Sequence, residues 1–239
     1  MIFEAEEITK SYKGKNVLSG VSLSFRQREI VGILGPNGAG KTTLFSILAG
    51  ITPAEKGKIH LNGFDITYLK IYERARKGIV YLPQDSSIFR GLSVEDNIRA
   101  VLQINLKSRE EIENRLDHLL ESFSLRQLRK SGAPRLSGGE RRKIEIARTL
   151  AACPKFLLLD EPFSGIDPIS VFEIIAIIKE LKDSGIGIII TDHNVRETLN
   201  ILDRGYIIAD GMILIEGSKD DILKNEEAKK IYLGQDFRI

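Results

Sequence analysis

The stretch EIVGILGPNGAGKTTLFSILAG, residues 29–50, joins an apolar run to a glycine-rich loop and then to a helical pattern. The apolar run IVGIL is typical of a buried strand, and KTTLFSILAG carries helix signals that end at Gly50. The loop between them matches G-x-x-x-x-G-K-[ST], in which glycines let backbone N–H groups turn inward around phosphate oxygens. Because both the preceding strand and the following helix are present, chance is a poor explanation. The stretch therefore predicts a nucleotide-phosphate site.

Within this loop, each residue type has a separate physical role. The Lys41 ammonium would lie on the β- and γ-phosphates, and the Thr42 hydroxyl could ligate Mg²⁺. The N-terminus of the following helix adds positive potential. The residues expected to bind nucleotide here are Gly35, Pro36, Asn37, Gly38, Ala39, Gly40, Lys41, Thr42 and Thr43.

Two later apolar runs end in polar residues that belong at the same site. FLLLDEP, residues 156–162, supplies Asp160 to hold Mg²⁺ through water and Glu161 as general base. A pair of acids that only caps a strand is the weaker explanation, because this run is wholly apolar and ends at a proline. IGIIITDH, residues 186–193, ends in His193. Carboxyl ends of parallel strands line the ligand crevice, so we expect His193 to contact the γ-phosphate.

A second anion-binding helix start is predicted in LSGGERRKIEIARTL, residues 136–150. Ser137 and Glu140 form a capping-box pattern, and two glycines between them would expose the first amides of the helix. One chain with one nucleotide does not need two such sites. A head-to-tail dimer, in which this helix start caps the nucleotide on the partner's loop, is the economical solution.

Basic residues gather around this helix start, and we interpret them as a solvated face beside a phosphate site. The chain has 35 Lys and Arg against 33 Asp and Glu, so its net charge of +2 gives no general case for nucleic acid. The residues concerned are Arg126, Arg129, Lys130, Arg135, Arg141, Arg142 and Lys143.

The composition is that of an ordinary globular protein, with 239 residues, 42% of them hydrophobic and 28% charged. The single Cys153 cannot form an internal disulfide and is expected to be a buried, inert thiol. His60 and His118 are expected to be structural or solvated. Acids in MIFEAEEITK argue against a signal peptide, and the densest apolar stretch, residues 171–181, is too short to cross a bilayer.

Strands that alternate with helices predict a mostly parallel sheet with a helical insertion. We expect one domain over residues 1–239. Its nucleotide-binding core with a β subdomain would comprise residues 1–88 and 151–217, and a helical subdomain would span 89–150. A C-terminal helix and tail would occupy 218–239.

Six motifs occur in an order and spacing that resembles one family, the ATP-binding subunits of ABC transporters. They are GPNGAGKTT, the Gln of YLPQ, LSGGE, FLLLDE, SGID and the His of TDH, and together they cover almost the whole chain. The resemblance implies an α/β fold of the P-loop NTPase (RecA-like) type, with an antiparallel β subdomain and an inserted α-helical subdomain. It also implies Mg²⁺-dependent ATP hydrolysis by a homodimer that works with two transmembrane permease subunits.

The same resemblance assigns roles to single residues. Tyr12 falls where an aromatic ring stacks on adenine, and Gln84 falls where an amide reaches Mg²⁺ and the attacking water. Asp167 in SGID would lie at the dimer seam. The implied metal ligands are Thr42, Gln84 and Asp160, and the residues implied to bind the partner's ATP are Ser137, Gly138, Gly139 and Glu140. Glu140 replaces the Gln of many relatives, and a capping interaction accepts either residue.

Within the family, three stretches look like the ATPase of the lipopolysaccharide transport (Lpt) exporter of Gram-negative bacteria. They are LPQDSSIFRGLSVEDNI, DEPFSGIDPISV with TDHNVRETL, and KKIYLGQDFRI. This implies a cytoplasmic chain, peripheral on the inner membrane, bound to Lpt-type permeases and a bitopic accessory protein. Phe89 and Arg90 would lie where a membrane subunit's helix packs, and the apolar residues of the tail, 232–239, favour docking on another surface.

Other functions remain open at this point. The nearest alternative is the ATPase of an importer of the branched-chain amino-acid type, which such chains also resemble. A soluble ABC ATPase acting on DNA is less suitable, because DNA-repair types carry a long coiled coil in this place, whereas only 95 residues lie between Lys41 and Ser137, without sustained heptads. One acting on ribosomes is less suitable because such proteins usually join two cassettes in one chain, and this chain has one. A scaffold that binds ATP without hydrolysis is disfavoured by Glu161.

Overall fold

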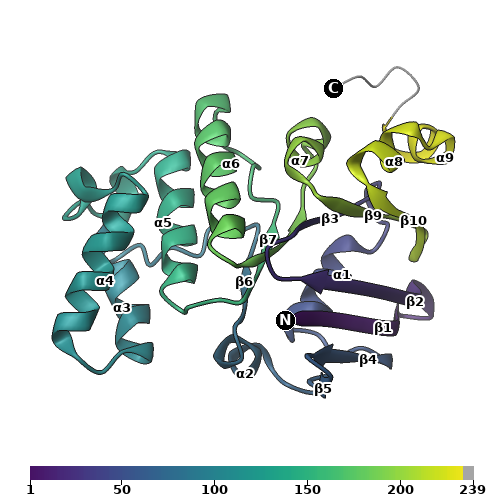
Figure 1. Cartoon of the computed structure of the whole chain (residues 1–239), viewed down its shortest axis with the longest axis horizontal. Helices are drawn as coiled ribbons and strands as arrows, with labels where there is room; N and C mark the ends of the chain where they lie inside the picture. Colours follow the sequence, from purple (N-terminus) through teal and green to yellow (C-terminus); the bar gives the residue numbers. More distant parts are fainter. Residues whose placement is uncertain (234–239) are drawn as a thin grey trace.

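The computed structural model describes residues 1–233, and two sheets form the centre of this part (Figure 1). An antiparallel sheet has the strand order β2-β1-β4-β5, and a second sheet has the order β10-β9-β3-β8-β7-β6. In the second sheet, the neighbours from β9 to β6 run parallel, and only β10 is antiparallel to β9. The strands are β1 (Ile2–Tyr12), β2 (Lys15–Arg26), β3 (Ile30–Leu34), β4 (Lys56–Leu61), β5 (Phe64–Asp65), β6 (Ile79–Leu82), β7 (Phe156–Asp160), β8 (Gly187–Thr191), β9 (Arg204–Ala209) and β10 (Met212–Ser218).

The parallel strands are apolar throughout because both faces of their sheet are covered. Along β7, Leu157 and Leu159 pack into a core with the helices, whereas Phe156 and Leu158 pack into a core with the antiparallel sheet and α1. Alternate side chains of a strand point to opposite faces, so a strand buried on both faces reads as a continuous apolar run. This confirms the predicted α/β fold with its mostly parallel sheet.

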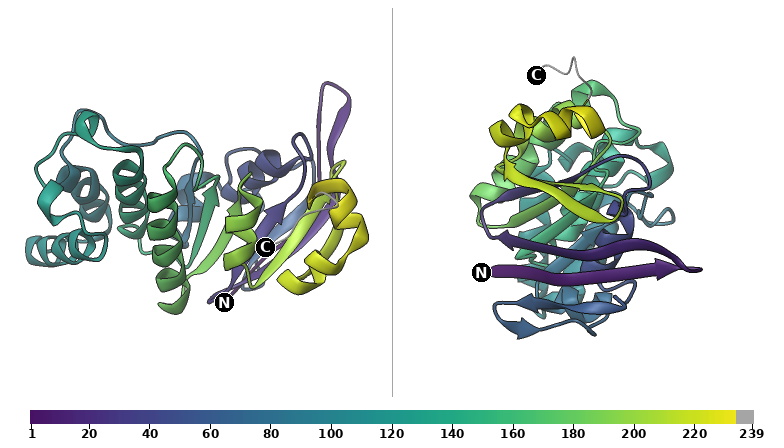
Figure 2. Two further views of the ribbon diagram at one scale, coloured as in Figure 1. Left: turned by 90° about the horizontal axis from the view of Figure 1, so that it is seen from above. Right: turned by 90° about the vertical axis from the view of Figure 1, so that its right-hand side faces the viewer.

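Helices cover the sheet and extend away from it at one end. Figure 1 shows α5, α6 and α7 side by side, with α3 and α4 beyond α5, at the end of the molecule opposite α8 and α9; Figure 2 shows the same order from above. The helices are α1 (Lys41–Ala49), α2 (Ile71–Arg76), α3 (Val94–Asn105), α4 (Arg109–Ser122), α5 (Gly138–Leu150), α6 (Pro168–Asp183), α7 (Val195–Ile201), α8 (Lys219–Lys224) and α9 (Glu226–Ala228), with two short 3₁₀ helices, η1 (Arg126–Leu128) and η2 (Ala133–Arg135), and a π-helical turn, η3 (Lys229–Leu233).

The segment between β6 and β7 is helical, and it holds α3, α4 and α5. The domain division given above remains our proposal for how these elements group. In the part of the chain that the structure describes, no helix is both long and apolar enough to cross a membrane. The predicted docking tail lies outside the described residues from residue 234 onward.

The prediction that Cys153 is buried was wrong. Its side chain is exposed, and its backbone has φ +52° in the turn that follows α5. The backbone reverses here between α5 and the buried strand β7, and such reversals lie at the surface. A small apolar residue type was therefore a poor guide to burial at this position.

Candidate active site

Four loops meet where strands of the parallel sheet end. The glycine-rich loop follows β3, and the neighbouring strands β8, β7 and β6 end before His193, Glu161 and Gln84 respectively. Between β3 and its later neighbours the chain crosses to the far edge of the sheet and returns. Such a switch in strand order opens a crevice at the carboxyl ends, which is where open α/β sheets bind ligands.

The glycine-rich loop needs glycine for close backbone approach. Gly35 has φ +149° and Gly40 has φ +103°, and a Cβ on either would lie within 2.7 Å of a backbone carbonyl oxygen, of Ile208 or Val17 respectively. Any side chain would therefore displace the loop from the strands beneath it. These two positions fix the path that the sequence pattern predicted.

A cavity of about 360 Å³ lies against this loop. It brings together residues predicted from separate motifs, since Lys41, Thr42, Glu161 and His193 all line it. The full lining is Val17, Asn37, Gly38, Gly40, Lys41, Thr42, Thr43, Glu161 and His193.

The Lys41 ammonium is held inside its own loop. Its Nζ donates to the carbonyl oxygens of Gly35 at 2.7 Å and Pro36 at 2.9 Å. Burial lowers the pKa of Lys41, and the nearby carboxylates of Glu161 and Asp160 act in the opposite direction. The side chain thus lies in the cavity wall and can exchange backbone carbonyls for phosphate oxygens.

Glu161 is the point on which the other predicted groups converge. The Gln84 amide donates to Oε2 of Glu161 at 2.6 Å, and Nε2 of His193 lies 2.5 Å from its Oε1. The backbone of Glu161 has φ +45°, in the left-handed region that non-glycine residues seldom adopt, and its N–H donates to the carbonyl of Thr191 at 2.7 Å. Uncommon backbone at this residue aims its carboxylate into the cavity, as is common at functional sites.

Asp160, the last residue of β7, is buried beside a tyrosine that the motifs did not identify. The Tyr81 hydroxyl, from the neighbouring strand β6, donates to Oδ2 of Asp160 at 2.9 Å. Burial raises the pKa of Asp160; the hydrogen bond from Tyr81 opposes this and the Glu161 charge adds to it. Tyr81 could have been suspected, because it lies on the strand that leads directly to Gln84.

Asp192, next to His193, organises its own loop. Its carboxylate accepts from the backbone N–H of Phe163 at 2.9 Å and of Asn194 at 2.7 Å. Burial raises the pKa of Asp192, and these two backbone donors lower it. Asp192 thereby ties the loop after β7 to the loop after β8 and fixes the position of His193.

The predicted capping box at the start of α5 is confirmed. The Ser137 hydroxyl accepts from the N–H of Glu140 at 3.2 Å, and the Glu140 carboxylate accepts from the N–H of Ser137 at 2.7 Å. Gly138 is the first residue of the helix. Gly139 is buried, and a Cβ there would lie 2.0 Å from the hydroxyl of Ser170. Glycine at Gly139 thus allows α5 to pack against the start of α6.

Asp167 caps α6 directly beside this contact. Its carboxylate accepts from the N–H of Ser170 at 3.0 Å and from the Ser170 hydroxyl at 2.6 Å. Within one chain, the SGID segment and the LSGGE segment therefore form one surface. Their predicted contacts with a partner's nucleotide stay a prediction.

The interpretation of the basic residues near α5 as one solvated face holds only in part: Arg126, Lys130 and Arg135 are exposed, whereas Arg142 is buried and Lys143 is half-buried. Arg142 is only 5% exposed and donates to backbone carbonyls at the strand ends. Lys143 pairs with Glu173 at 2.8 Å, and Arg129 and Lys130 both bind the buried Glu95. Buried carbonyl and carboxylate groups require donors, and these side chains provide them.

The remaining predicted residues lie away from the cavity wall. Tyr12 is exposed at the end of β1, with the Lys10 ammonium 5.3 Å from its ring centre. Phe89 is 48% exposed in the loop between β6 and α3, and the Arg148 guanidinium lies 4.6 Å from its ring centre. Arg90 is exposed next to it. The structure places Phe89 and Arg90 together on the surface, apart from the carboxylates. His60 is half-buried beside Glu6, and His118 is exposed, as expected.

Comparison with known proteins gives a consistent result. A family model described as "ABC transporter" matches residues 18–164. The chain is 54% identical over 236 residues to the lipopolysaccharide export system ATP-binding protein LptB of Escherichia coli, covering 98% of each chain. Among solved structures, it resembles the ADP conformation of MJ1267, an ATP-binding cassette of an ABC transporter, with a TM-score of 0.88, 30% identity and coverage of 98% and 99%. It also resembles a dimeric bacterial ABC transporter cassette, MJ0796, with a TM-score of 0.81, 25% identity and coverage of 92% and 99%.

Proposed function

The chain belongs to the ABC transporter family as an ATP-binding subunit, and from this premise we propose that its ATP hydrolysis powers lipopolysaccharide export. The observation that carries the hydrolytic part is the convergence of Gln84 and His193 on the Glu161 carboxylate, in the wall of the cavity that holds Lys41 and Thr42. The substrate follows from the 54% identity to LptB over nearly the full length of both chains. Because LptB is named as part of an export system, this similarity does not favour the alternative of an amino-acid importer.

The residues around the cavity fit Mg²⁺. Tyr81 occupies one carboxylate oxygen of Asp160, so the other can face a cation, and the Gln84 amide nitrogen faces Glu161, so its oxygen can do the same. With the Thr42 hydroxyl, these are the hard oxygen donors that Mg²⁺ prefers. When bound, Mg²⁺ would neutralise charge on the β- and γ-phosphates.

The proposed mechanism assigns each side chain one task. Lys41 leaves the carbonyls of its own loop for the β- and γ-phosphates. Glu161 accepts a proton from the attacking water, and Gln84, bonded to one oxygen of that carboxylate, fixes its direction. His193 moves from the carboxylate to the γ-phosphate when ATP arrives, which frees the second carboxylate oxygen for the water.

We propose further that ATP closes a homodimer. The surface made by LSGGE and SGID, with Ser137, Gly138, Gly139, Glu140 and Asp167, would cap the ATP on the partner's glycine-rich loop. Tyr12 would stack on adenine. The dimeric cassette MJ0796, which resembles this chain, supports such an arrangement. Loss of the γ-phosphate would remove the bridge between the two chains and let the dimer open.

The docking loop, residues 85–93, is proposed to contact two transmembrane permease subunits of Lpt type, and through them a bitopic accessory protein. Phe89 offers a half-exposed aromatic ring and Arg90 a charged side chain on the same loop. Exposed aromatic and arginine side chains are frequent anchors of protein interfaces. The chain would then sit on the cytoplasmic face of the inner membrane through its partners.

Purification of the tagged chain from its native membranes tests the transport assignment. We expect two exporter subunits and a small bitopic protein to co-purify. The variant F89A should lose most of this association, because loss of an anchoring aromatic often weakens binding by about 2 kcal/mol or more. F64A, which truncates another exposed phenylalanine, is the matched control.

Two outcomes would contradict separate parts of this proposal. An importer permease pair among the co-purified proteins would overturn lipopolysaccharide export but leave the ATPase assignment intact. Equal recovery of the permeases with F89A and wild type would overturn the docking role of Phe89 alone.

A further inference from the structure

Three side chains on one face of α5 connect the candidate active site to the docking loop. Arg142, Glu145 and Arg148 lie three positions apart along the helix, so they follow one another on the same side. We refer to these three residues as the α5 ladder. Glu145 is 2% exposed, and no motif of the sequence singled it out.

The first residue of the ladder holds the backbone beneath the catalytic carboxylate. The Arg142 guanidinium donates to the backbone carbonyl oxygens of Pro83 at 3.1 Å, Asp160 at 3.1 Å and Pro162 at 3.3 Å. Two of these carbonyls flank Glu161 in sequence, and the third precedes Gln84. One buried side chain therefore fixes the backbone on both sides of the predicted base.

The other two residues hold the docking loop. One Glu145 oxygen accepts from the Ser86 hydroxyl at 2.7 Å and from the Ser87 N–H at 2.8 Å, while the second accepts from Arg142 at 3.2 Å. Arg148 donates to the Ser87 hydroxyl and stacks on the ring of Phe89. The ladder thus ends on the ring that we propose as an anchor.

A separate clamp holds the same loop from α3 and does not touch the active site. The side chain of Asn97, which is fully buried, accepts from the N–H of Phe89 at 2.8 Å and donates to its carbonyl at 3.1 Å. It also donates to the carbonyl of Ser93 at 3.0 Å. Asn97 therefore orders the loop locally and provides a natural comparison for the ladder.

Charge makes the ladder a coupled unit. A buried carboxylate is costly unless it is paired and hydrogen-bonded, and in the described structure the bonds to Glu145 come from Arg142 and from the docking loop. If the loop moved away alone, Glu145 would lose two donors and stay buried. If Arg142 moved alone, three backbone carbonyls and Glu145 would lose a donor. Movement of the loop and of the active-site backbone together avoids both costs.

We propose that Glu145 is a positioning residue that couples the docking loop to the backbone around Glu161. Displacement of Phe89 by a partner is passed through Glu145 and Arg142 to the carbonyls that flank the catalytic base. The identity of the loop as a docking surface rests on the proposed function, but the mechanical link between loop and active site does not.

Hydrogen exchange of the full chain without nucleotide tests the link. The variant E145Q keeps the side-chain shape but removes the charge that pairs with Arg142. We expect exchange at Ser87 to rise by about tenfold or more, and exchange at the amides of Glu161 and Phe163 to rise with it. The control N97S should speed exchange at Phe89 and leave the amides of Glu161 and Phe163 within about twofold of wild type.

A second measurement adds the non-hydrolysable analogue AMP-PNP with Mg²⁺. In the wild type, the bound analogue should slow exchange over residues 85–92 by about threefold or more, and this response should vanish in E145Q but persist in N97S. If E145Q fails to fold, S86A removes one loop donor to Glu145 and should reduce the response in the same direction.

The outcomes separate the two proposals. The link would be overturned if exchange at Ser87 becomes faster in E145Q while the exchange rates of the Glu161 and Phe163 amides stay as in wild type. This holds whether or not nucleotide is bound. A wild-type chain that fails to bind AMP-PNP would instead contradict the proposed ATPase function, and the nucleotide-free comparison would still decide the link.

Discussion

Two regions of the described structure that hold buried carboxylates differ in the charges around them. Glu95 lies in the first turn of α3 in the helical segment, whereas Asp160 is the last residue of β7 and Glu161 follows it beside the cavity. All three side chains are almost inaccessible to solvent. Since isolated buried charges are costly, the way in which each charge is balanced indicates what each region is for.

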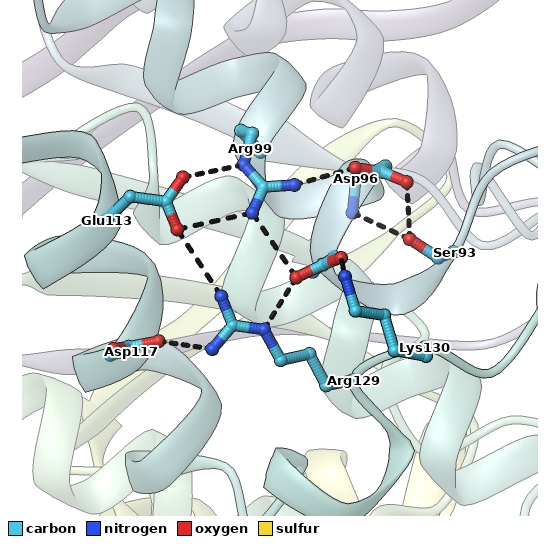
Figure 3. A network of polar contacts seen from close by, with 8 residues as sticks. Ser93, Asp96, Arg99, Glu113, Asp117, Arg129 and Lys130 are labelled. Atoms are coloured by element: carbon cyan, nitrogen blue, oxygen red, sulfur yellow. Dashed lines mark hydrogen bonds and ion pairs between the residues drawn. The ribbon is translucent and has the colours of Figure 1, made fainter. Parts of the chain in front are cut away.

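Glu95 is surrounded by cations. Arg99, Arg129 and Lys130 all bind its carboxylate, and the two arginines also bind Glu113 on α4 (Figure 3). Burial would raise the pKa of Glu95, but hydrogen bonds from Lys130, Arg129 and Arg99 outweigh it and lower the pKa to about 2. The network joins α3, α4 and the segment after η1, which is a structural role.

The cavity carboxylates have fewer cations. Asp160 accepts from the neutral Tyr81 hydroxyl, and Lys41 is bonded to backbone carbonyls rather than to either carboxylate. Burial raises the pKa of Asp160, in the direction opposite to Glu95. A buried acid with this shift in a cleft is a candidate for binding or catalysis. The comparison teaches that incomplete charge balance, rather than burial, marks the functional region.

The largest expected effect comes from E161Q. Loss of the base should reduce ATP turnover by roughly 10²–10⁴-fold, while the affinity for ATP changes less than about threefold. The variant should accumulate as an ATP-bound dimer, measured by light scattering after size exclusion. E121Q, on an exposed acid paired with Arg126, is the control. Normal turnover in E161Q would remove Glu161 from the role of base.

The variant E95Q should show the opposite pattern. It leaves three cations around an uncharged amide, and we expect the free energy of unfolding to fall by about 2–3 kcal/mol. The loss is no larger because the three cations can partly reach water. Urea unfolding measures this change, and E121Q should stay within about 0.5 kcal/mol of wild type. Basal ATP turnover per folded molecule should be retained. A loss of turnover without a loss of stability would reverse the contrast between the two regions.

Acid titration sharpens the same contrast. The pKa of Glu95 in the folded chain is about 2, below its ordinary 4.5, so this carboxylate stabilises the fold above pH 4.5 and that contribution is lost as pH falls toward 2. The difference in unfolding free energy between wild type and E95Q should therefore shrink as pH falls from about 5 to about 3. A difference that stays constant over this range would show that Glu95 acts through packing instead of charge.

The smallest expected effect is that of Y81F. Loss of the hydroxyl leaves Oδ2 of Asp160 without its donor, so the carboxylate is less firmly oriented toward Mg²⁺. We expect the Mg²⁺ concentration for half-maximal nucleotide binding to rise by about tenfold, measured with a fluorescent ATP analogue. Binding of the analogue in EDTA should not change. Y68F, at an exposed tyrosine, is the control, and an unaltered Mg²⁺ requirement in Y81F would exclude this role.

Much of the site could be predicted because its residues lie in short contiguous motifs. The glycine-rich loop, the acids after FLLL and the capping box at Ser137 each depend on neighbours within a few positions, so local chemistry identifies them. The alternation of strands and helices then predicted a parallel sheet, and in such a sheet the motifs that follow the strands lie together at the carboxyl ends of the strands.

The sequence by itself determined the family, the α/β fold and the residues predicted to bind nucleotide. Secondary-structure patterns and phosphate-binding motifs each extend over a few consecutive residues, so they can be recognised without the tertiary structure. Only the tertiary structure decided how buried charges are shared. Tyr81 meets Asp160 from 79 positions away, and Ser86 meets Glu145 from 59 positions away. Cys153 is exposed in a turn, and its residue type alone did not reveal this. Such contacts depend on which strands and helices become neighbours. The type of one residue does not reveal which distant residue it will contact.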